Sequence, residues 1–143
     1  MKKLLSIALA LCIMAMCIPY SIAASYNGFV YEVNSDNTIT ITGFNDFSAN
    51  NVVIPSQISG KNVTAIGQGA FQLKSNITSV KIADTVKSVG SMAFYNCQNL
   101  KSVTLGNATT SIGAKAFNTC TSLTSINFKN VQTCLLYTSD AAD

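Results

Sequence analysis

The 143-residue sequence contains no histidine, no tryptophan and no arginine. Without histidine, the chain lacks the base that most often activates a catalytic cysteine or serine, and the commonest nitrogen ligand for metals. Without arginine, and with a formal net charge of only +3, it lacks the clustered basic surface typical of nucleic-acid-binding proteins. These absences argue against catalysis, zinc binding and nucleic-acid binding.

The N-terminal segment, 1–24, has the pattern of a secretory signal peptide. Lys2 and Lys3 precede an uncharged apolar run over 4–18, which is followed by Pro19 and the small-residue sequence SIAAS. The run of about 15 residues is shorter than the roughly 20 that span a bilayer as a helix. This length favours cleavage after residue 23 or 24 over a membrane anchor. We therefore predict a secreted or cell-surface protein with no membrane insertion after cleavage.

Removal of residues 1–24 also changes the charge and cysteine counts. Seven lysines remain against six acidic residues, a net charge of +1, and three of the five cysteines remain, namely Cys97, Cys120 and Cys134. Exported proteins of this size that depend on disulfides usually contain more cysteines, in even number. The fold must therefore be held together by other means.

The main feature of the sequence is a short repeat at a constant interval. SVGSMAFYNCQNLKS (88–102) and SIGAKAFNTCTSLTS (111–125) are identical at seven of 15 positions, and a third copy over 66–77 has Lys74 in place of the cysteine. This copy over 66–77 is the first along the chain, and it has five extra residues before it, around 59–61. A repeat this short cannot form a core alone, so the copies are predicted to stack as the rungs of a solenoid. The structural repeat positions are Gly67, Phe71, Gly90, Phe94, Cys97, Leu100, Gly113, Phe117, Cys120 and Leu123.

Each repeat is predicted to contain a short parallel strand, a second short extended piece and one helical turn. SVKIA and SVTLG read as the strand, SVG and SIG as the end of the extended piece, and SMAFYNC and AKAFNTC as the helical turn. The glycine that ends the extended piece indicates either positive φ or close approach of another backbone. Before the repeats, alternation in FVYEVNSDNTITITGF predicts a β-hairpin with a polar turn over 34–37 and with Phe29, Tyr31 and Val33 on one face.

These patterns divide the chain into four parts. A signal peptide occupies 1–24, an N-terminal hairpin cap 25–51, and about three rungs with a truncated fourth 52–133. The C-terminal stretch CLLYTSDAAD (134–143) does not continue the repeat and is similar to a translated sequencing adapter. We predict that it is a non-native tail; a short native tail is the alternative.

The repeats resemble a known family. VVIPSQISGKNVTAIGQGAF, VKSVGSMAFYNCQNLKSVTL and TTSIGAKAFNTCTSLTSINF are similar to BspA-type leucine-rich repeats, and the preceding hairpin resembles the cap of such arrays. The resemblance covers about residues 28–133. It implies a curved leucine-rich-repeat solenoid, with strands along one face, in a secreted or surface protein. Several members of the family bind host proteins or take part in adhesion.

The residues that could carry chemistry favour structural roles. Cys97 and Cys120 have no histidine to activate them and too few partners for a zinc site, so buried free thiols are favoured over a disulfide between rungs and over metal binding or catalysis. The acidic residues are isolated and fit turns better than a glycosidase pair. We predict no catalytic residue, no cofactor and no metal.

The predicted strands offer a candidate partner-binding face. Its outward residues are Ser79, Lys81, Ser102, Thr104, Ser125 and Asn127. A solvated face without a ligand is the alternative, because the face contains none of the aromatic or arginine anchors typical of protein interfaces. We predict a non-catalytic protein that binds an extracellular or host-surface protein. The alternative is a structural spacer or capping module of a longer exported protein.

Overall fold

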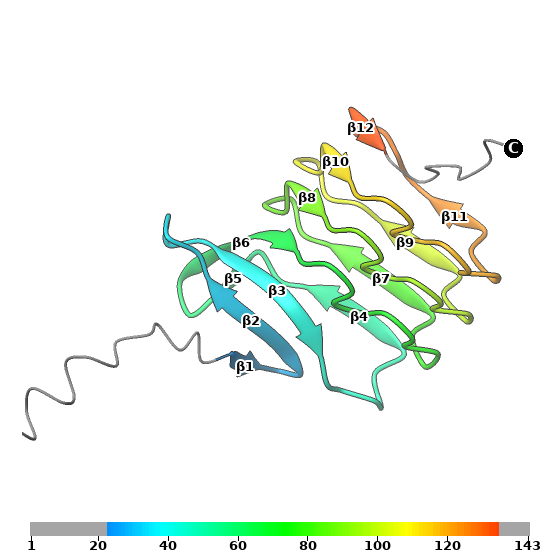
Figure 1. The fold of residues 1–143 in the computed structure, drawn as a ribbon, viewed down its shortest axis with the longest axis horizontal. Coiled ribbons are helices and arrows are strands. Elements are labelled where there is room, and N and C mark those ends of the chain that lie inside the picture. Colours follow the sequence, from blue (N-terminus) through cyan, green and yellow to red (C-terminus); the bar gives the residue numbers. More distant parts are fainter. Residues whose placement is uncertain (1–22, 135–143) are drawn as a thin grey trace, which may run out of the picture.

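A computed structural model describes residues 23–134, which form twelve strands (Figure 1). The strands are β1 (Ala24–Tyr26), β2 (Phe29–Val33), β3 (Ile39–Phe44), β4 (Asn51–Ile54), β5 (Gln57–Ile58), β6 (Lys61–Ile66), β7 (Ser79–Ile82), β8 (Ser88–Val89), β9 (Ser102–Thr104), β10 (Ser111–Ile112), β11 (Ser125–Ile126) and β12 (Thr133–Cys134). Over the same residues there is no helix long and apolar enough to span a bilayer.

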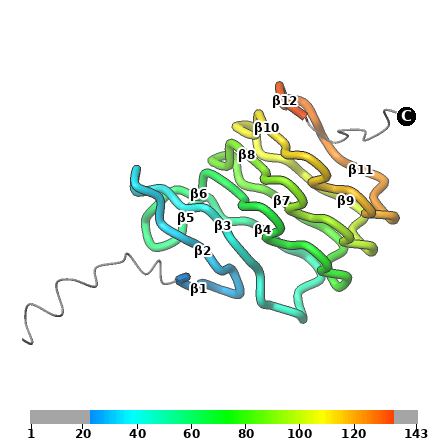
Figure 2. Tube along the Cα trace, viewed as in Figure 1, coloured from blue at the N-terminus to red at the C-terminus, as the bar shows by residue number. Residues whose placement is uncertain are grey.

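The chain winds as a solenoid between two sheets, as Figure 2 shows along its trace. One sheet has the order β11-β9-β7-β4, and the other includes β3-β6-β8-β10-β12. Each rung therefore contributes one strand to each sheet, and the strands of successive rungs pair in parallel. We number the rungs from one to four by their first strands, β4, β7, β9 and β11. The predicted parallel solenoid is confirmed.

The register between rungs follows the sequence repeat. Ser79 pairs with Ser102, and Ser102 with Ser125, so that equivalent positions of the repeat lie side by side. Asn51 pairs with Ser79, so the first rung is five residues longer. These extra residues form a small hairpin in which β5 pairs antiparallel with β6. This insertion places Ile58 in the core and leaves the register of the later rungs unchanged.

The predicted N-terminal hairpin covers one end of the solenoid. β2 and β3 pair antiparallel, and β3 then pairs in parallel with β6 of the first rung. Phe29 and Tyr31 are buried, as expected, but Val33 is half-exposed. Val33 lies at the end of β2, where the chain enters the polar turn and has left the solenoid core. Val33 pairs with Ile39 and so lies on the same face as Tyr31, as predicted, but this end of the face is open to solvent.

The third side of each rung is a series of tight turns, and the predicted helical turn is not found there. In the second rung, the N–H of Ala93 donates to the carbonyl three residues back, whereas the N–H of Met92 donates to the carbonyl of Ala114 in the third rung. This alternation continues through residues 94–97. Met92 and Asn96 have φ of 55° and 57°, as the third residue of a type II turn requires. A helix would use these N–H groups within the rung and leave none for the next one.

A row of phenylalanines runs through the core. The rings of Phe71 and Phe94 stack at 4.9 Å between centroids, and those of Phe94 and Phe117 at 5.3 Å. Phe44 of the hairpin lies 5.3 Å from Phe71, and Phe29 packs on Phe44 at 5.1 Å. The hairpin therefore supplies, from an unrelated sequence, the aromatic layer that a preceding rung would supply.

The repeated glycines mark close contacts between rungs. A Cβ at Gly90 would lie 2.7 Å from the carbonyl carbon of Gly67, and one at Gly113 would lie 2.4 Å from the nitrogen of Ser91. Real Cβ atoms do not approach this closely, and neither glycine has positive φ. Of the two predicted reasons for the glycine, close backbone approach is the one found.

Candidate functional site

The predicted partner-binding residues lie mostly on the outer face of the β11-β9-β7-β4 sheet. Their pairing forms two columns, which we call the strand ladder. Lys81 and Thr104 are exposed, and their column continues to Val53 of β4. Ser79, Ser102 and Ser125 form the second column, which continues to Asn51. The alternation of buried and outward residues along β7 and β9 is the one expected from the sequence.

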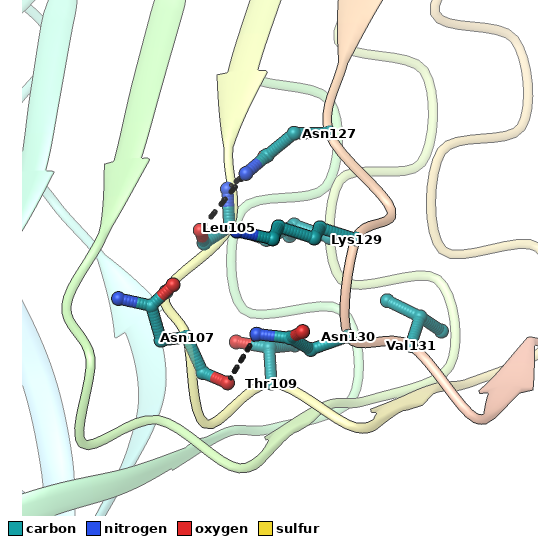
Figure 3. Close-up of a pocket in the computed structure, with 8 residues that line it drawn as sticks. Leu105, Asn107, Thr109, Asn127, Lys129, Asn130 and Val131 are labelled. Atoms are coloured by element: carbon teal, nitrogen blue, oxygen red, sulfur yellow. Dashed lines mark hydrogen bonds between the residues drawn. The ribbon is translucent and has the colours of Figure 1, made fainter.

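Asn127 does not belong to this ladder. Its Oδ1 accepts a hydrogen bond from the N–H of Leu105 at 2.6 Å, and its Nδ2 donates to the carbonyl of Leu105 at 3.3 Å (Figure 3). The amide thus pairs with the backbone of the third rung just after β11 ends. Although Asn127 is exposed, both ends of its amide are already engaged. Its role in this structure is to join two rungs.

A small cavity lies beside Asn127. It is lined by Leu105, Asn107, Thr109, Lys129 and Val131, among others, and has a volume of about 10 Å³ (Figure 3). Such a volume is close to the minimum for one water molecule. Asn130 closes one side by donating to the carbonyl of Asn107 at 2.9 Å. The cavity is therefore too small for an organic ligand.

The two repeated cysteines join rungs through their thiols. The Cys97 thiol donates to the carbonyl of Phe71 and the Cys120 thiol to the carbonyl of Phe94, both at 3.0 Å. Cys97 is fully buried and Cys120 half-buried, and both are free. The neighbouring Cys120 thiol and burial raise the pKa of Cys97, which keeps it protonated. The interaction with Cys97 lowers the pKa of Cys120. The geometry is that of packed thiols with a hydrogen-bonding role.

This geometry explains why the first rung has lysine at the cysteine position. The segment before this rung is the N-terminal hairpin with its loop over 45–50, which does not contain the turn series of a rung. Lys74 instead places its ammonium 4.2 Å from the centroid of the Phe47 ring. The substitution occurs in the rung that is preceded by this loop and not by the turn series of another rung.

Two acidic side chains, Asp36 in the hairpin turn and Asp46 in the following loop, organise turns, as predicted. Asp36 Oδ1 accepts from the N–H and hydroxyl of Thr38, and these bonds lower the pKa of Asp36. Asp46 Oδ1 accepts in the same way from Ser48, and its pKa is lowered for the same reason. Within residues 23–134, no group of three or more acidic or cysteine side chains is arranged to hold a metal ion.

One exposed aromatic residue was not singled out from the sequence. Phe47, in the loop between β3 and β4, is 72% exposed and lies against Lys74. Its sequence context, DFSANN, reads only as a polar loop. The contact becomes visible only when the loop is placed beside the turns of the first rung.

Comparison with known proteins identifies related sequences and folds. Residues 37–138 match the BspA type leucine-rich repeat region, in six copies. A leucine-rich cell surface protein from Faecalibacterium prausnitzii is 37% identical, with a TM-score of 0.67 over 73% of this chain and 30% of that chain. A leucine-rich repeat protein of T. pallidum is 30% identical, with a TM-score of 0.70 over 73% of this chain and 49% of that chain.

A further solved structure is similar over nearly its full length. A leucine-rich repeat protein from Bacteroides capillosus is 25% identical, with a TM-score of 0.65 over 80% of this chain and 94% of that chain. By contrast, the chain spans only about a third and a half of the F. prausnitzii and T. pallidum structures. Comparison with curated proteins finds no match.

Proposed function

The chain belongs to the BspA-type leucine-rich-repeat family, and we propose that it is a secreted or cell-surface protein that binds other proteins through the strand ladder, without catalysis of its own. The single observation that carries this proposal is the regular outward face of the β11-β9-β7-β4 sheet. Paired strands place Ser79, Ser102 and Ser125 in register, at a spacing of about 4.8 Å. Solenoids commonly use such extended faces for partners.

The chemistry of the ladder favours a polar, peptide-like partner. Its side chains are short and hydroxylic, with Lys81 as an exposed cation and Val53 as an exposed apolar residue in the same column. Hydroxyl groups can donate and accept hydrogen bonds, so they suit backbone amides of another protein. The F. prausnitzii protein, which is similar in sequence, is described as a cell surface protein. This supports an extracellular setting for the proposed binding.

The second candidate is a structural spacer within a longer exported protein. It is favoured by the absence of aromatic or arginine anchors among the ladder residues Ser79, Lys81, Ser102, Thr104 and Ser125, since such anchors provide most of the energy of protein interfaces. A spacer needs only the stacking of rungs and no recognition of a partner.

A charge reversal on the ladder distinguishes the two candidates. The protein lacking residues 1–24 is assayed for binding to immobilised extracellular-matrix proteins and to whole bacterial cells. The Lys81→Glu/Thr104→Glu variant is expected to lose at least about tenfold in affinity. The matched control is Lys87→Glu, at an exposed lysine beside β8 on the other sheet, which should change affinity by less than about twofold. Equal losses for both variants, or no binding by the wild-type protein, would favour the spacer.

A further inference from the structure

The loop between β3 and β4 is held by hydrogen bonds and carries Phe47, which has the most exposed large hydrophobic side chain in the part of the chain that the structure describes. Asp46 Oδ1 accepts hydrogen bonds from the N–H groups of Ser48 and Ala49, at 2.9 and 3.2 Å. Asn76 Nδ2 donates to the carbonyl of Ala49 at 2.7 Å, which fixes the loop to the first rung. A loop that is ordered before binding loses less conformational entropy on binding.

Phe47 lies in the middle of this loop, and its side chain contributes little to the stability of the fold. Its ring is 72% exposed, and its contact with Lys74 is a cation–π interaction at 4.2 Å. Such contacts contribute little at exposed sites. The other phenylalanines of the hairpin and first rung, Phe29, Phe44 and Phe71, are buried in the aromatic row. Phe47 is thus an aromatic residue displayed on a fixed backbone.

Leu73, next to Lys74, is unfavourable for the stability of the fold in two respects. It is 61% exposed, and its φ is 63°, a left-handed conformation that disfavours side chains with a Cβ. The fold requires positive φ here, because the equivalent Asn96 and Thr119 have φ of 57° and 62°. Asparagine tolerates this conformation best among residues with a side chain. An exposed leucine at this position therefore benefits neither the turn nor the core.

We propose that Phe47, Leu73 and Lys74 form a second protein-binding surface, the loop corner, which takes an extended partner segment with an apolar side chain next to a carboxylate. Phe47 and Leu73 offer apolar area, and Lys74 offers the cation. Between Asp46 and Asp84 the sequence contains no acidic residue. The Asp46 carboxylate keeps its charge, but its Oδ1 is committed to hydrogen bonds within its own loop. A carboxylate of the partner can therefore pair with Lys74.

The loop corner is separate from the strand ladder. It is formed by the loop after β3 and the turns of the first rung, near the hairpin end of the molecule (Figure 1). The ladder lies on the outer face of the sheet that β4, β7, β9 and β11 form. Variants at the corner should therefore leave binding at the ladder unchanged.

The test uses two synthetic pentapeptides and the protein lacking residues 1–24, uniformly labelled with ¹⁵N. Ac-EFELE-NH2 is the probe and Ac-KFKLK-NH2 is its charge-reversed control, each added to about 1 mM. We expect the acidic peptide to shift amide resonances over 45–50 and 72–76 only. Phe47→Ser should weaken this binding at least about tenfold, whereas Lys81→Glu on the ladder should not change it.

Leu73→Asn gives a readout that a purely structural role would not produce. Replacing leucine by a residue that tolerates positive φ should raise the melting temperature by about 2–5 °C while reducing peptide affinity at least about fivefold. The proposal is overturned if both peptides shift the same resonances, if the shifts lie elsewhere or are absent, or if Leu73→Asn binds as well as the wild type. Shifts that depend on protein concentration without peptide would assign the corner to a second copy of the chain and would also overturn it.

Discussion

The two ends of the described solenoid differ in how well equivalent residues are buried. In the second and third rungs, Ile82 and Leu105 are buried, the latter only 6% exposed, whereas the equivalent Phe128 of the fourth rung is 40% exposed. Leu100 is fully buried, but Leu123 is only half-buried. At the other end, the hairpin covers the first rung and Phe71 is fully buried. Identical repeat positions therefore have different environments.

This difference shows that a rung does not bury its own core residues. Each interior rung is covered by the rungs before and after it, and the hairpin takes the place of the preceding rung for the first. Phe44 continues the aromatic row and β3 continues the sheet, although neither belongs to the repeat. Stability in such proteins is close to a sum of rung and interface contributions. Substitutions at equivalent positions should therefore have effects that depend on the number of neighbouring rungs.

The largest effect is expected from deleting an interior ring of the aromatic row. Phe94 stacks on Phe71 and Phe117, and is fully buried. Phe94→Ala should destabilise the protein by about 4 kcal/mol through lost contacts and a cavity. Phe117 lies at the end of this row within the described residues, so Phe117→Ala should destabilise the protein by about half as much. Urea unfolding of both variants measures the difference, and equal losses would contradict the dependence on neighbours.

A slightly smaller effect is expected where backbones of adjacent rungs touch. A Cβ at Gly106 would lie 2.1 Å from the carbonyl oxygen of Ala83 in the preceding rung. Gly106→Ala must therefore separate two rungs, at a cost of about 3 kcal/mol. The control is Gly60→Ala in the β5–β6 hairpin, where the added atom meets nothing and only the positive φ of 76° opposes it. That variant should lose about 1 kcal/mol, as thermal unfolding would show.

Much of this arrangement could be predicted from the sequence because the repeat is spatially regular. The constant interval between copies determines the register, and the recurring Phe94 indicated an inward ring, whereas the recurring Gly113 left positive φ and close backbone approach as alternatives. The turn series could not be predicted, since the pattern of Ala93, Phe94 and Cys97 fits one helical turn equally well. Hydrogen bonds to the neighbouring rung decide against the helix. That information lies in the stacking and not in the period of apolar residues.

Prediction of the candidate site from the sequence was limited in the same way, by contacts that form only when rungs stack. Alternation along β7 and β9 was sufficient to place Lys81 and Thr104 on the outer face. It failed for Asn127, because β11 ends at Ile126 and the asparagine amide then pairs with the backbone of Leu105. The loop corner could not be found at all, since Phe47 and Lys74 are far apart in the sequence and meet only through the folding of the loop onto the first rung.

Intermediate effects are expected at the cysteine position. Cys97→Ala leaves the buried carbonyl of Phe71 without its thiol donor, and should cost about 2 kcal/mol. Cys120→Ala, at a half-buried position, should cost about 1 kcal/mol. Lys74→Cys should not stabilise the first rung, because no preceding turn series offers an acceptor. Denaturant unfolding of the three variants is the measurement, and a stabilising Lys74→Cys would contradict this explanation of the repeat.

The smallest effect is a pH dependence confined to the hairpin end. The side-chain hydrogen bonds of Asp36 from Thr38 and of Asp46 from Ser48 lower the pKa of each carboxyl below its usual range in the folded protein. Such groups contribute stability above the unfolded pKa of about 3.9, and that contribution is lost as pH falls through the lower folded value. The sequence from 85 to 134 contains no acidic residue, and in the later rungs the N–H of Asn107, which donates to Asp84 Oδ1, is the exception among amides that otherwise bond to uncharged acceptors.

Amide hydrogen exchange at about pH 6 and about pH 2.5, corrected for the intrinsic rate, tests this contrast. Protection at Thr38 and Ser48 should fall at the lower pH, because their N–H groups donate to the two carboxylates. Protection at Gly113, whose N–H donates to the carbonyl of Val89 in the preceding rung, should not change. Asp36→Asn should remove the response at Thr38 alone. An equal loss of protection across all rungs would show that acid acts on the whole solenoid, and the two ends would then not differ in this respect.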